Sequence, residues 1–235
     1  MLFAAFFQTN GRALRKTTTH SPTTLNTTRL CLVRHGETDW NAQRRIQGQI
    51  DIPLNAAGCV QAQAAAAGVA GRRFDAIYSS DLRRALQTAE PIAAALGLPL
   101  KQAAGLRERH YGRMQGLTSA EARERFPGLH AVYAARDPHH DLEGGETLSE
   151  FASRVAASLQ ALVAAHPGGS LLAVSHGGVL DVAYRLATGR DLTAPRDFVM
   201  PNAGLNWIEY RAQRWHVVSW GEQDHLPASL DEVGQ

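Results

Sequence analysis

The chain has 235 residues, of which 44% are hydrophobic and 20% charged, and its formal net charge is +2. These proportions are typical of a globular protein, and no apolar run approaches the ~18 residues that span a membrane. The weak positive charge comes without a basic stripe interleaved with aromatic residues, which argues against nucleic acid as a partner and suits a small anionic ligand.

The first 28 residues differ in composition from the rest of the chain. They contain no Asp or Glu, and seven of the twelve residues from Thr17 to Thr28 are threonine. An acid-free leader with Arg and Thr resembles a transit peptide, whereas its short apolar start without a preceding cation does not fit a secretory signal. We favour a disordered extension at 1–28, followed by one domain at 29–228 and a tail at 229–235.

Apolar runs alternate with helical patterns through the domain. Strands are expected at Leu30–Val33, Ala76–Ser79, Leu98–Lys101, Leu171–Ser175, Leu205–Tyr210 and Trp215–Ser219. Helices are expected at 55–71, 82–96, 151–162 and 178–186. Two capping boxes, Thr118 with Glu121 and Thr147 with Glu150, predict helix starts. Pro91 should kink or restart the helix that contains it.

Strands that alternate with helices predict crossover connections. The expected fold class is α/β, a three-layer sandwich with a mostly parallel central sheet and helices on both faces. The first and fourth strands are almost continuously apolar, as strands buried on both sides are. Only Arg211 to Arg214 join the last two strands. That link is too short for a crossover, so one strand should run antiparallel.

Four of the predicted strands lead to charged or polar residues at the sheet edge where α/β proteins bind ligands. The first is followed by Arg34 and His35, the second by residues 79–84, the third by Glu108 and the fourth by His176. Converging buried cations repel one another unless they hold an anion, and arginine forks and free helix N–H groups suit a phosphate. A neutral imidazole can attack phosphorus while a glutamate protonates the leaving group.

Four motifs around these residues carry a resemblance to a known family. They are Arg34-His35-Gly36-Glu37-Thr38 with Asn41 and Gln47-Gly48, SSDLRRALQTA from Ser79 to Ala89, LRERHYG from Leu106 to Gly112, and VSHGG from Val174 to Gly178. In this order they resemble the motifs of the histidine phosphatase superfamily, the phosphoglycerate mutase-like group with an RHG signature. The resemblance covers about residues 29–226.

The resemblance implies a role for each motif residue. His35 would accept the phosphoryl group, and Arg34, Arg84 and His176 would complete the phosphate pocket. Glu108 would act first as the acid and then as the base. The substrate would be bound by Asn41, Gln47, Gly48, Arg109, Tyr111 and Gly177.

No metal is expected, because the arginines and a second, protonated histidine can neutralise the phosphate oxygens. No cofactor is expected either, except 2,3-bisphosphoglycerate as a primer if the protein is a mutase. The expected partner is a small phosphomonoester, and the sequence leaves room for a homodimer. Cys31 and Cys59 indicate reduced, packed thiols and therefore a cytoplasmic location.

The choice between phosphatase and mutase depends on segments around the site. RERHYGRMQGL resembles the mutases, whereas Gly144 to Thr147, at the start of a helix, resembles the phosphatase and sugar-bisphosphatase branch. The segment from Gly116 to Gly144 is shorter than the mutase stretch that covers the site, and a mutase must keep water from its phosphohistidine. We therefore expect a phosphomonoester hydrolase with a phosphohistidine intermediate, acting on a sugar phosphate or a phosphoglycerate-like metabolite. The alternatives are a cofactor-dependent phosphoglycerate mutase and, less favoured, a non-catalytic phosphate-binding regulatory protein.

Overall fold

The computed structural model describes residues 27–227, and a six-stranded sheet lies at the centre of this part of the chain. The strand order is β3-β2-β4-β1-β5-β6. The strands are β1 (Thr28–Arg34), β2 (Ala76–Ser79), β3 (Leu100–Gln102), β4 (Ser170–Ser175), β5 (Leu205–Arg211) and β6 (Arg214–Glu222). β1 to β4 are parallel, and β5 runs antiparallel to β1 and β6. The predicted α/β class, with a mostly parallel sheet and one antiparallel strand, is confirmed.

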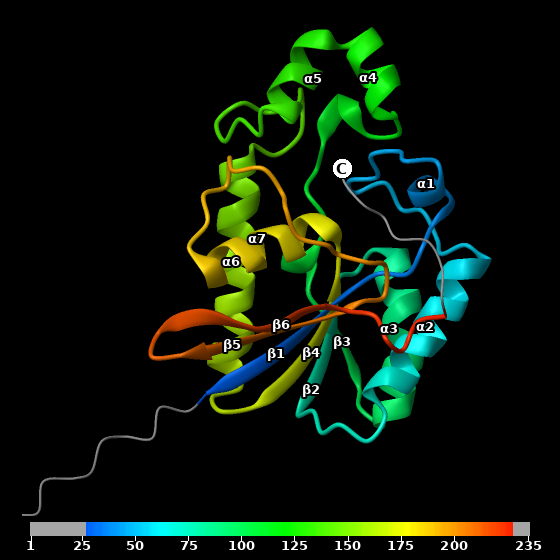
Figure 1. The fold of residues 1–235 in the computed structure, drawn as a ribbon, viewed down its shortest axis with the longest axis vertical. Helices are drawn as coiled ribbons and strands as arrows, with labels where there is room; N and C mark the ends of the chain where they lie inside the picture. Colours follow the sequence, from blue (N-terminus) through cyan, green and yellow to red (C-terminus); the bar gives the residue numbers. More distant parts are fainter. Residues whose placement is uncertain (1–26, 228–235) are drawn as a thin grey trace, which may run out of the picture.

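Helices cover both faces of this sheet (Figure 1). They are α1 (Asp39–Ala42), α2 (Ala56–Val69), α3 (Arg83–Leu96), α4 (Ser119–Arg125), α5 (Pro127–Ala134), α6 (Leu148–Ala165) and α7 (Gly177–Thr188), with 3-10 turns η1 (Ala104–Leu106) and η2 (Gly112–Met114). In Figure 1, α2 and α3 lie on one side of the sheet and α6 and α7 on the other, while α4 and α5 stand apart at the top.

The alternation of side chains along β1 explains the three layers. Leu30 and Leu32 are fully buried in a cluster with residues of α6 and α7, whereas Cys31 and Val33 are fully buried in a second cluster with residues of α2 and α3. Successive side chains of a strand point to opposite faces, so an all-apolar strand fills two cores at once.

Two local predictions have different outcomes. The capping boxes at Thr118 and Thr147 are both present, and they open α4 and α6. By contrast, α3 runs through Pro91 as one helix, so it does not restart there, and the alternative of a kink stays a prediction. Its buried residues include Ala89 and Ile92 on either side of the proline, and their packing holds the helix together despite the lost backbone hydrogen bond.

The chain ends and the cysteines can be compared with the sequence only in part. Residues 1–26 and 228–235 of the expected extension and tail lie outside the described residues, and β1 already begins at buried Thr28. Cys31 is buried as predicted, but Cys59 is exposed, because it lies on the outer face of α2. None of the helices in residues 27–227 has the length and apolar character needed to cross a membrane.

The strand order brings the predicted motifs to one edge of the sheet. β1 and β4 are neighbours, with Arg34 opposite Ser175 at their carboxyl ends. β2 flanks β4 on its other side, with Ser79 opposite Val174. The three loops that leave these strands therefore start next to one another, as parallel strands require.

Candidate active site

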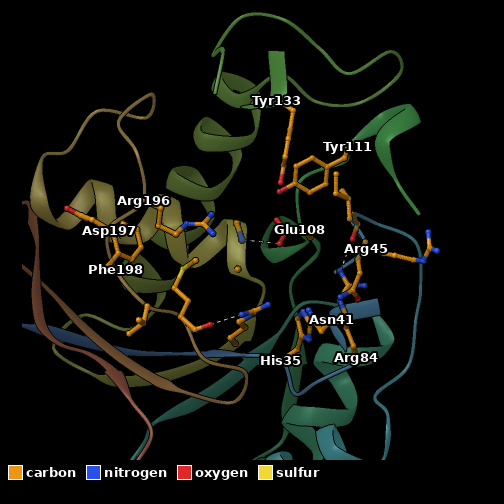
Figure 2. A pocket seen from close by; sticks show the side chains of 18 residues that line it. His35, Asn41, Arg45, Arg84, Glu108, Tyr111, Tyr133, Arg196, Asp197 and Phe198 are labelled. Carbon is orange, nitrogen blue, oxygen red and sulfur yellow. Dashed lines mark hydrogen bonds between the residues drawn. The ribbon is translucent and has the colours of Figure 1, made fainter. Parts of the chain in front are cut away.

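A cavity of about 370 Å³ lies at this edge of the sheet. Nine of the eleven predicted site residues line it: Arg34, His35, Asn41, Gln47, Gly48, Arg84, Glu108, Tyr111 and Gly177. Figure 2 shows His35 and Arg84 at the bottom of the cavity, Glu108 in the middle, and Tyr111 above. The remaining two predicted residues, His176 and Arg109, are not part of the lining.

His35 has one free ring nitrogen. Its Nδ1 lies 2.7 Å from the carbonyl oxygen of Gly36. A carbonyl can only accept, so Nδ1 carries the proton and the lone pair is on Nε2. Burial, followed by the charges of Arg84 and Arg34, lowers the pKa of His35 well below 6.5. The imidazole is therefore neutral at physiological pH, in the form that a nucleophile needs.

The backbone around His35 is fixed from several elements. Its N–H donates to the carbonyl of Ser175 on β4 (2.8 Å), and its carbonyl accepts from the side-chain amide of Asn202 (2.8 Å). The next residue, Gly36, donates its N–H to the Thr88 hydroxyl on α3 (2.9 Å). A Cβ on Gly36 would lie 2.6 Å from the carbonyl oxygen of Gly58, so only glycine allows α2 to approach this closely.

Arg84 is held rigidly by backbone carbonyls. It is fully buried, and its terminal nitrogens donate to Ile50 O (2.9 Å) and Gly48 O (2.7 Å). Its Nε is buried with no hydrogen-bond partner in the described part of the chain. Burial lowers the pKa of Arg84 to about 10, against the raising effect of Glu108, so the group stays charged at neutral pH. At the end of β1, Arg34 donates to the Met200 carbonyl (2.7 Å).

His176 lies behind the cavity instead of lining it. It is fully buried at the N-cap of α7, its Nε2 is 2.8 Å from the Ser80 hydroxyl, and its ring centroid is 5.2 Å from that of His35. Burial first, then Arg84 and His35, lowers the pKa of His176 well below 6.5. In the free protein His176 is therefore neutral, because burial and the neighbouring cations disfavour a positive charge; its predicted protonation beside a bound phosphate stays a prediction.

The Glu108 carboxylate is positioned by two backbone N–H groups. Oε1 accepts from Arg109 N (2.8 Å) and Oε2 from Gly178 N at the start of α7 (2.9 Å). A Cβ on Gly178 would lie 2.1 Å from Oε1, so the contact requires glycine. Other nearby carboxylates are committed elsewhere, Glu37 to Asn55 and Glu146 to Arg154. Asp197, which also lines the cavity, is paired with Arg190, so Glu108 is the carboxylate that lies above His35 (Figure 2).

Asn41, Gln47 and Gly48 come from the loop after β1. The Asn41 side-chain oxygen accepts from the Thr38 N–H and hydroxyl (3.1 and 3.0 Å), which leaves its NH₂ group as a donor. The Gln47 side-chain oxygen is buried without a partner among the described residues. Gly48 has a φ of +56°, and its carbonyl holds Arg84. These residues add neutral polar groups beside the arginines.

Arg109 does not face the cavity, contrary to the prediction. Its Nε donates to the Glu146 carbonyl (3.0 Å), and its guanidinium lies over the Tyr111 ring, 5.5 Å from the centroid. It is 5% exposed. The residue therefore supports Tyr111 from behind, because the loop before α6 offers it an acceptor on that side.

The sequence reasoning missed one side of the cavity. Arg45, Tyr133 and the segment from Arg196 to Met200, in the loop between α7 and β5, also form the lining. These residues follow no strand and belong to no predicted motif. A loop residue that touches β1 through its backbone, as Met200 does, leaves no pattern in the sequence.

The family model described as histidine phosphatase superfamily (branch 1) matches residues 30–223, which is most of the chain. The chain belongs to this superfamily. It is 38% identical over 204 residues to a metal-independent phosphoserine phosphatase of Arabidopsis thaliana, covering 85% of this chain and 83% of the relative.

Two further comparisons show the range of relatives of this superfamily member. A probable phosphoglycerate mutase, GpmB, of Salmonella choleraesuis is 36% identical over 213 residues, covering 86% of this chain and 97% of the relative. The crystal structure of a phosphoserine phosphatase mutant from Entamoeba histolytica, in complex with phosphoserine, superposes with a TM-score of 0.77 at 28% identity. That match covers 85% of this chain and 100% of the other.

Proposed function

We propose that this histidine phosphatase superfamily enzyme is a metal-independent phosphomonoester hydrolase that acts through a phosphohistidine on a small phosphorylated metabolite. The observation that carries the proposal is the geometry of His35. Its Nδ1–H is held by Gly36 O, so Nε2 keeps its lone pair in a cavity lined by Arg34, Arg84 and Glu108. A positioned neutral nucleophile, two cations and one carboxyl group are the parts that phosphoryl transfer to a side chain needs.

In the first step, His35 Nε2 attacks phosphorus and the bond from phosphorus to the ester oxygen breaks. The Glu108 carboxyl gives its proton to the departing oxygen. The hydrogen bond from Nδ1 to Gly36 O stabilises the positive charge that the imidazole gains. Arg34 and Arg84 offset the charge on the phosphoryl oxygens, where their guanidinium forks suit the geometry.

In the second step, the Glu108 carboxylate takes a proton from water, and the resulting hydroxide attacks phosphorus. The bond from phosphorus to Nε2 breaks, inorganic phosphate leaves and neutral His35 returns. His176 supports the site without lining the cavity. Its Nε2 contacts the Ser80 hydroxyl and holds it in place, and its ring centroid lies 5.2 Å from that of His35. A bound phosphate dianion favours protonation of His176, so charge on His176 belongs to the complex.

The segment between η2 and α6 covers little of the cavity, and this favours hydrolysis over the mutase reaction. The segment between η2 and α6 forms two short helices, α4 and α5, and only Tyr133 of these helices lines the cavity. A mutase needs a site closed to water while the phosphohistidine waits for its acceptor. The phosphoserine phosphatase relatives support the same choice.

The test is a product analysis in the presence of a chelator. We expect wild type to release inorganic phosphate from phosphorylated glycerates, sugars or amino acids at an unchanged rate after chelation, and we expect His35→Ala to release none. Interconversion of 2- and 3-phosphoglycerate faster than phosphate release would replace the hydrolase with the mutase. Recovery of activity only on adding a divalent metal would overturn the mechanism.

A further inference from the structure

The arginines that line the cavity differ in how their N–H groups are used. Arg45 uses all three of its nitrogens and four of its five N–H groups, because it donates to Glu121 (2.6 and 3.2 Å), to Gly116 O (2.7 Å) and to Gln43 (3.0 Å). Arg196 makes one hydrogen bond, from Nε to Asp181 (3.2 Å). Its two terminal nitrogens have no partner within residues 27–227, and its side chain is 27% exposed. Arg196 therefore offers the bidentate edge of its guanidinium to the cavity.

The anchor of Arg196 is a buried carboxylate shared by three arginines. Asp181 on α7 is 3% exposed, and it accepts from Arg136 (2.6 Å), Arg185 (3.1 Å) and Arg196 (3.2 Å). Burial alone would raise the pKa of Asp181, but the three arginines hold it below its usual range. One negative charge among three guanidinium groups leaves an excess of positive charge, which favours an anion nearby.

The other two arginines of this cluster hold the loop through hydrogen bonds to its backbone carbonyls. Arg136 donates from Nε to Leu192 O (2.7 Å), and Arg185 donates to Asp191 O and to Ala194 O (2.8 Å). Both therefore tie the segment before Arg196 to α7 and to the end of α5. Arg196 alone among the three lines the cavity and lacks carbonyl partners for its terminal nitrogens within the described residues.

Two phenols complete this end of the cavity. Tyr111 and Tyr133 both line it, and their rings pack edge to face with centroids 5.8 Å apart. Neither hydroxyl has a hydrogen-bond partner in the described part of the chain, so both remain available as donors. In Figure 2 the tyrosines reach down and Arg196 reaches in from the side, all toward the space in front of Glu108.

We infer that Arg196, Tyr111 and Tyr133 bind a second anionic group of the substrate, such as a carboxylate, while its phosphate lies against His35, Arg34 and Arg84. This inference rests on the proposed hydrolase function and narrows its substrates to phosphomonoesters that carry a second anionic group besides the phosphate. The cavity volume of about 370 Å³ equals that of roughly a dozen water molecules, which leaves room for such a group beyond the phosphate.

A matched pair of substrates tests the inference. 3-Phosphoglycerate carries a carboxylate where glycerol 3-phosphate carries a neutral alcohol, and glucose 1,6-bisphosphate compared with glucose 6-phosphate tests a second phosphate in the same way. For the substrate of one pair that carries the second anionic group, we expect Arg196→Gln to lower kcat/KM by roughly 10- to 100-fold, as for a lost hydrogen bond to a charged group. For the substrate whose only anionic group is its phosphate, we expect kcat/KM to change by less than about threefold.

The control is Arg211→Gln, which removes an exposed arginine of β5 that pairs with Glu209 and does not line the cavity. It should leave the preference for the second anion intact. An equal loss for both members of each pair in Arg196→Gln would overturn the subsite, as would a wild-type enzyme with no preference. Hydrolysis of p-nitrophenyl phosphate, which lacks a second anion, is measured alongside. If wild type hydrolyses p-nitrophenyl phosphate but shows no preference for a second anionic group, only the subsite is contradicted. If wild type does not hydrolyse p-nitrophenyl phosphate, the hydrolase proposal itself is contradicted.

Discussion

The floor and the roof of the cavity are built in different ways. The floor, Arg34, His35 and Arg84, sits on the ends of buried strands and on a buried helix start, and backbone groups fix it. The roof, here Tyr133 and Arg196, comes from a surface helix and a loop. An ion-pair cluster fixes the loop to the domain. The floor is thus set by the fold itself, and the roof by a few side-chain contacts.

This difference assigns separate tasks to the two regions. Variants in the floor and at Glu108 should slow the chemical step for every substrate, because every phosphomonoester presents the same phosphate. Variants in the roof should change the ratio between substrates, because the part beyond the phosphate differs. The predictions below use that contrast.

The largest effect is expected for Glu108→Gln. The amide keeps the shape of the carboxyl group but can neither donate the proton nor act as base, so kcat should fall by about 10²–10⁴-fold for alkyl phosphates. With p-nitrophenyl phosphate, whose leaving group needs little protonation, a stoichiometric burst of nitrophenol should precede a stall. Stopped-flow absorbance measures both phases.

The matched control is Glu143→Gln, which removes an exposed carboxylate that pairs with Arg113. It should behave as wild type. If Glu108→Gln hydrolysed alkyl phosphates at the wild-type rate, Glu108 would have a structural role only. The general acid would then have to be another carboxyl group, such as Glu37 or Glu146.

A smaller loss is expected for Gly178→Ala. The new Cβ would meet Glu108 Oε1 at 2.1 Å and displace the far end of that side chain, with little backbone strain because Gly178 is helical. A displacement of this size should lower kcat by roughly 10- to 100-fold for all substrates alike. The thermal midpoint should move little.

Gly128→Ala in α5, where an added Cβ meets nothing within 4 Å, serves as the control and should keep wild-type kinetics. A Gly178→Ala enzyme that lost activity toward one substrate of a matched pair only would contradict the division between floor and roof.

The smallest effect is the pH dependence of stability. His35 and His176 have pKa values well below 6.5 in the folded protein because they are buried beside arginines. Between those values and 6.5, the unfolded chain binds protons that the folded chain does not, so the free energy of unfolding should fall as pH drops below 6.5. Each of the two histidines contributes to this loss of stability. Urea unfolding should show a weaker pH dependence in His35→Ala than in wild type, and an equal dependence would contradict burial of a neutral His35.

The sequence predicts the floor well because its residues immediately follow apolar strands. Arg34 and His35 end one buried run, His176 ends another, and parallel pairing forces those ends together. Arg84, which the resemblance places in the phosphate pocket, is fully buried, whereas its neighbour Arg83 is exposed.

The roof could not be predicted in the same way. Arg196 reaches the cavity because Asp181, fifteen residues earlier, holds it, and no local period encodes that pair. Arg109 shows the converse, since it belongs to a motif yet turns toward Glu146 O. Loop conformation follows from tertiary contacts, whereas strand ends follow from the pattern of apolar residues.

The central claim, attack by His35 Nε2, is tested most directly by trapping the intermediate. Glu108→Gln is mixed briefly with p-nitrophenyl phosphate and denatured, and the phosphorylated peptide is located by mass spectrometry, with His35→Ala carried through in parallel. We predict one phosphoryl group per chain on His35, labile in acid and stable in alkali, and none in His35→Ala. Phosphate on serine, aspartate or His176, or a labelled His35→Ala protein, would contradict the account.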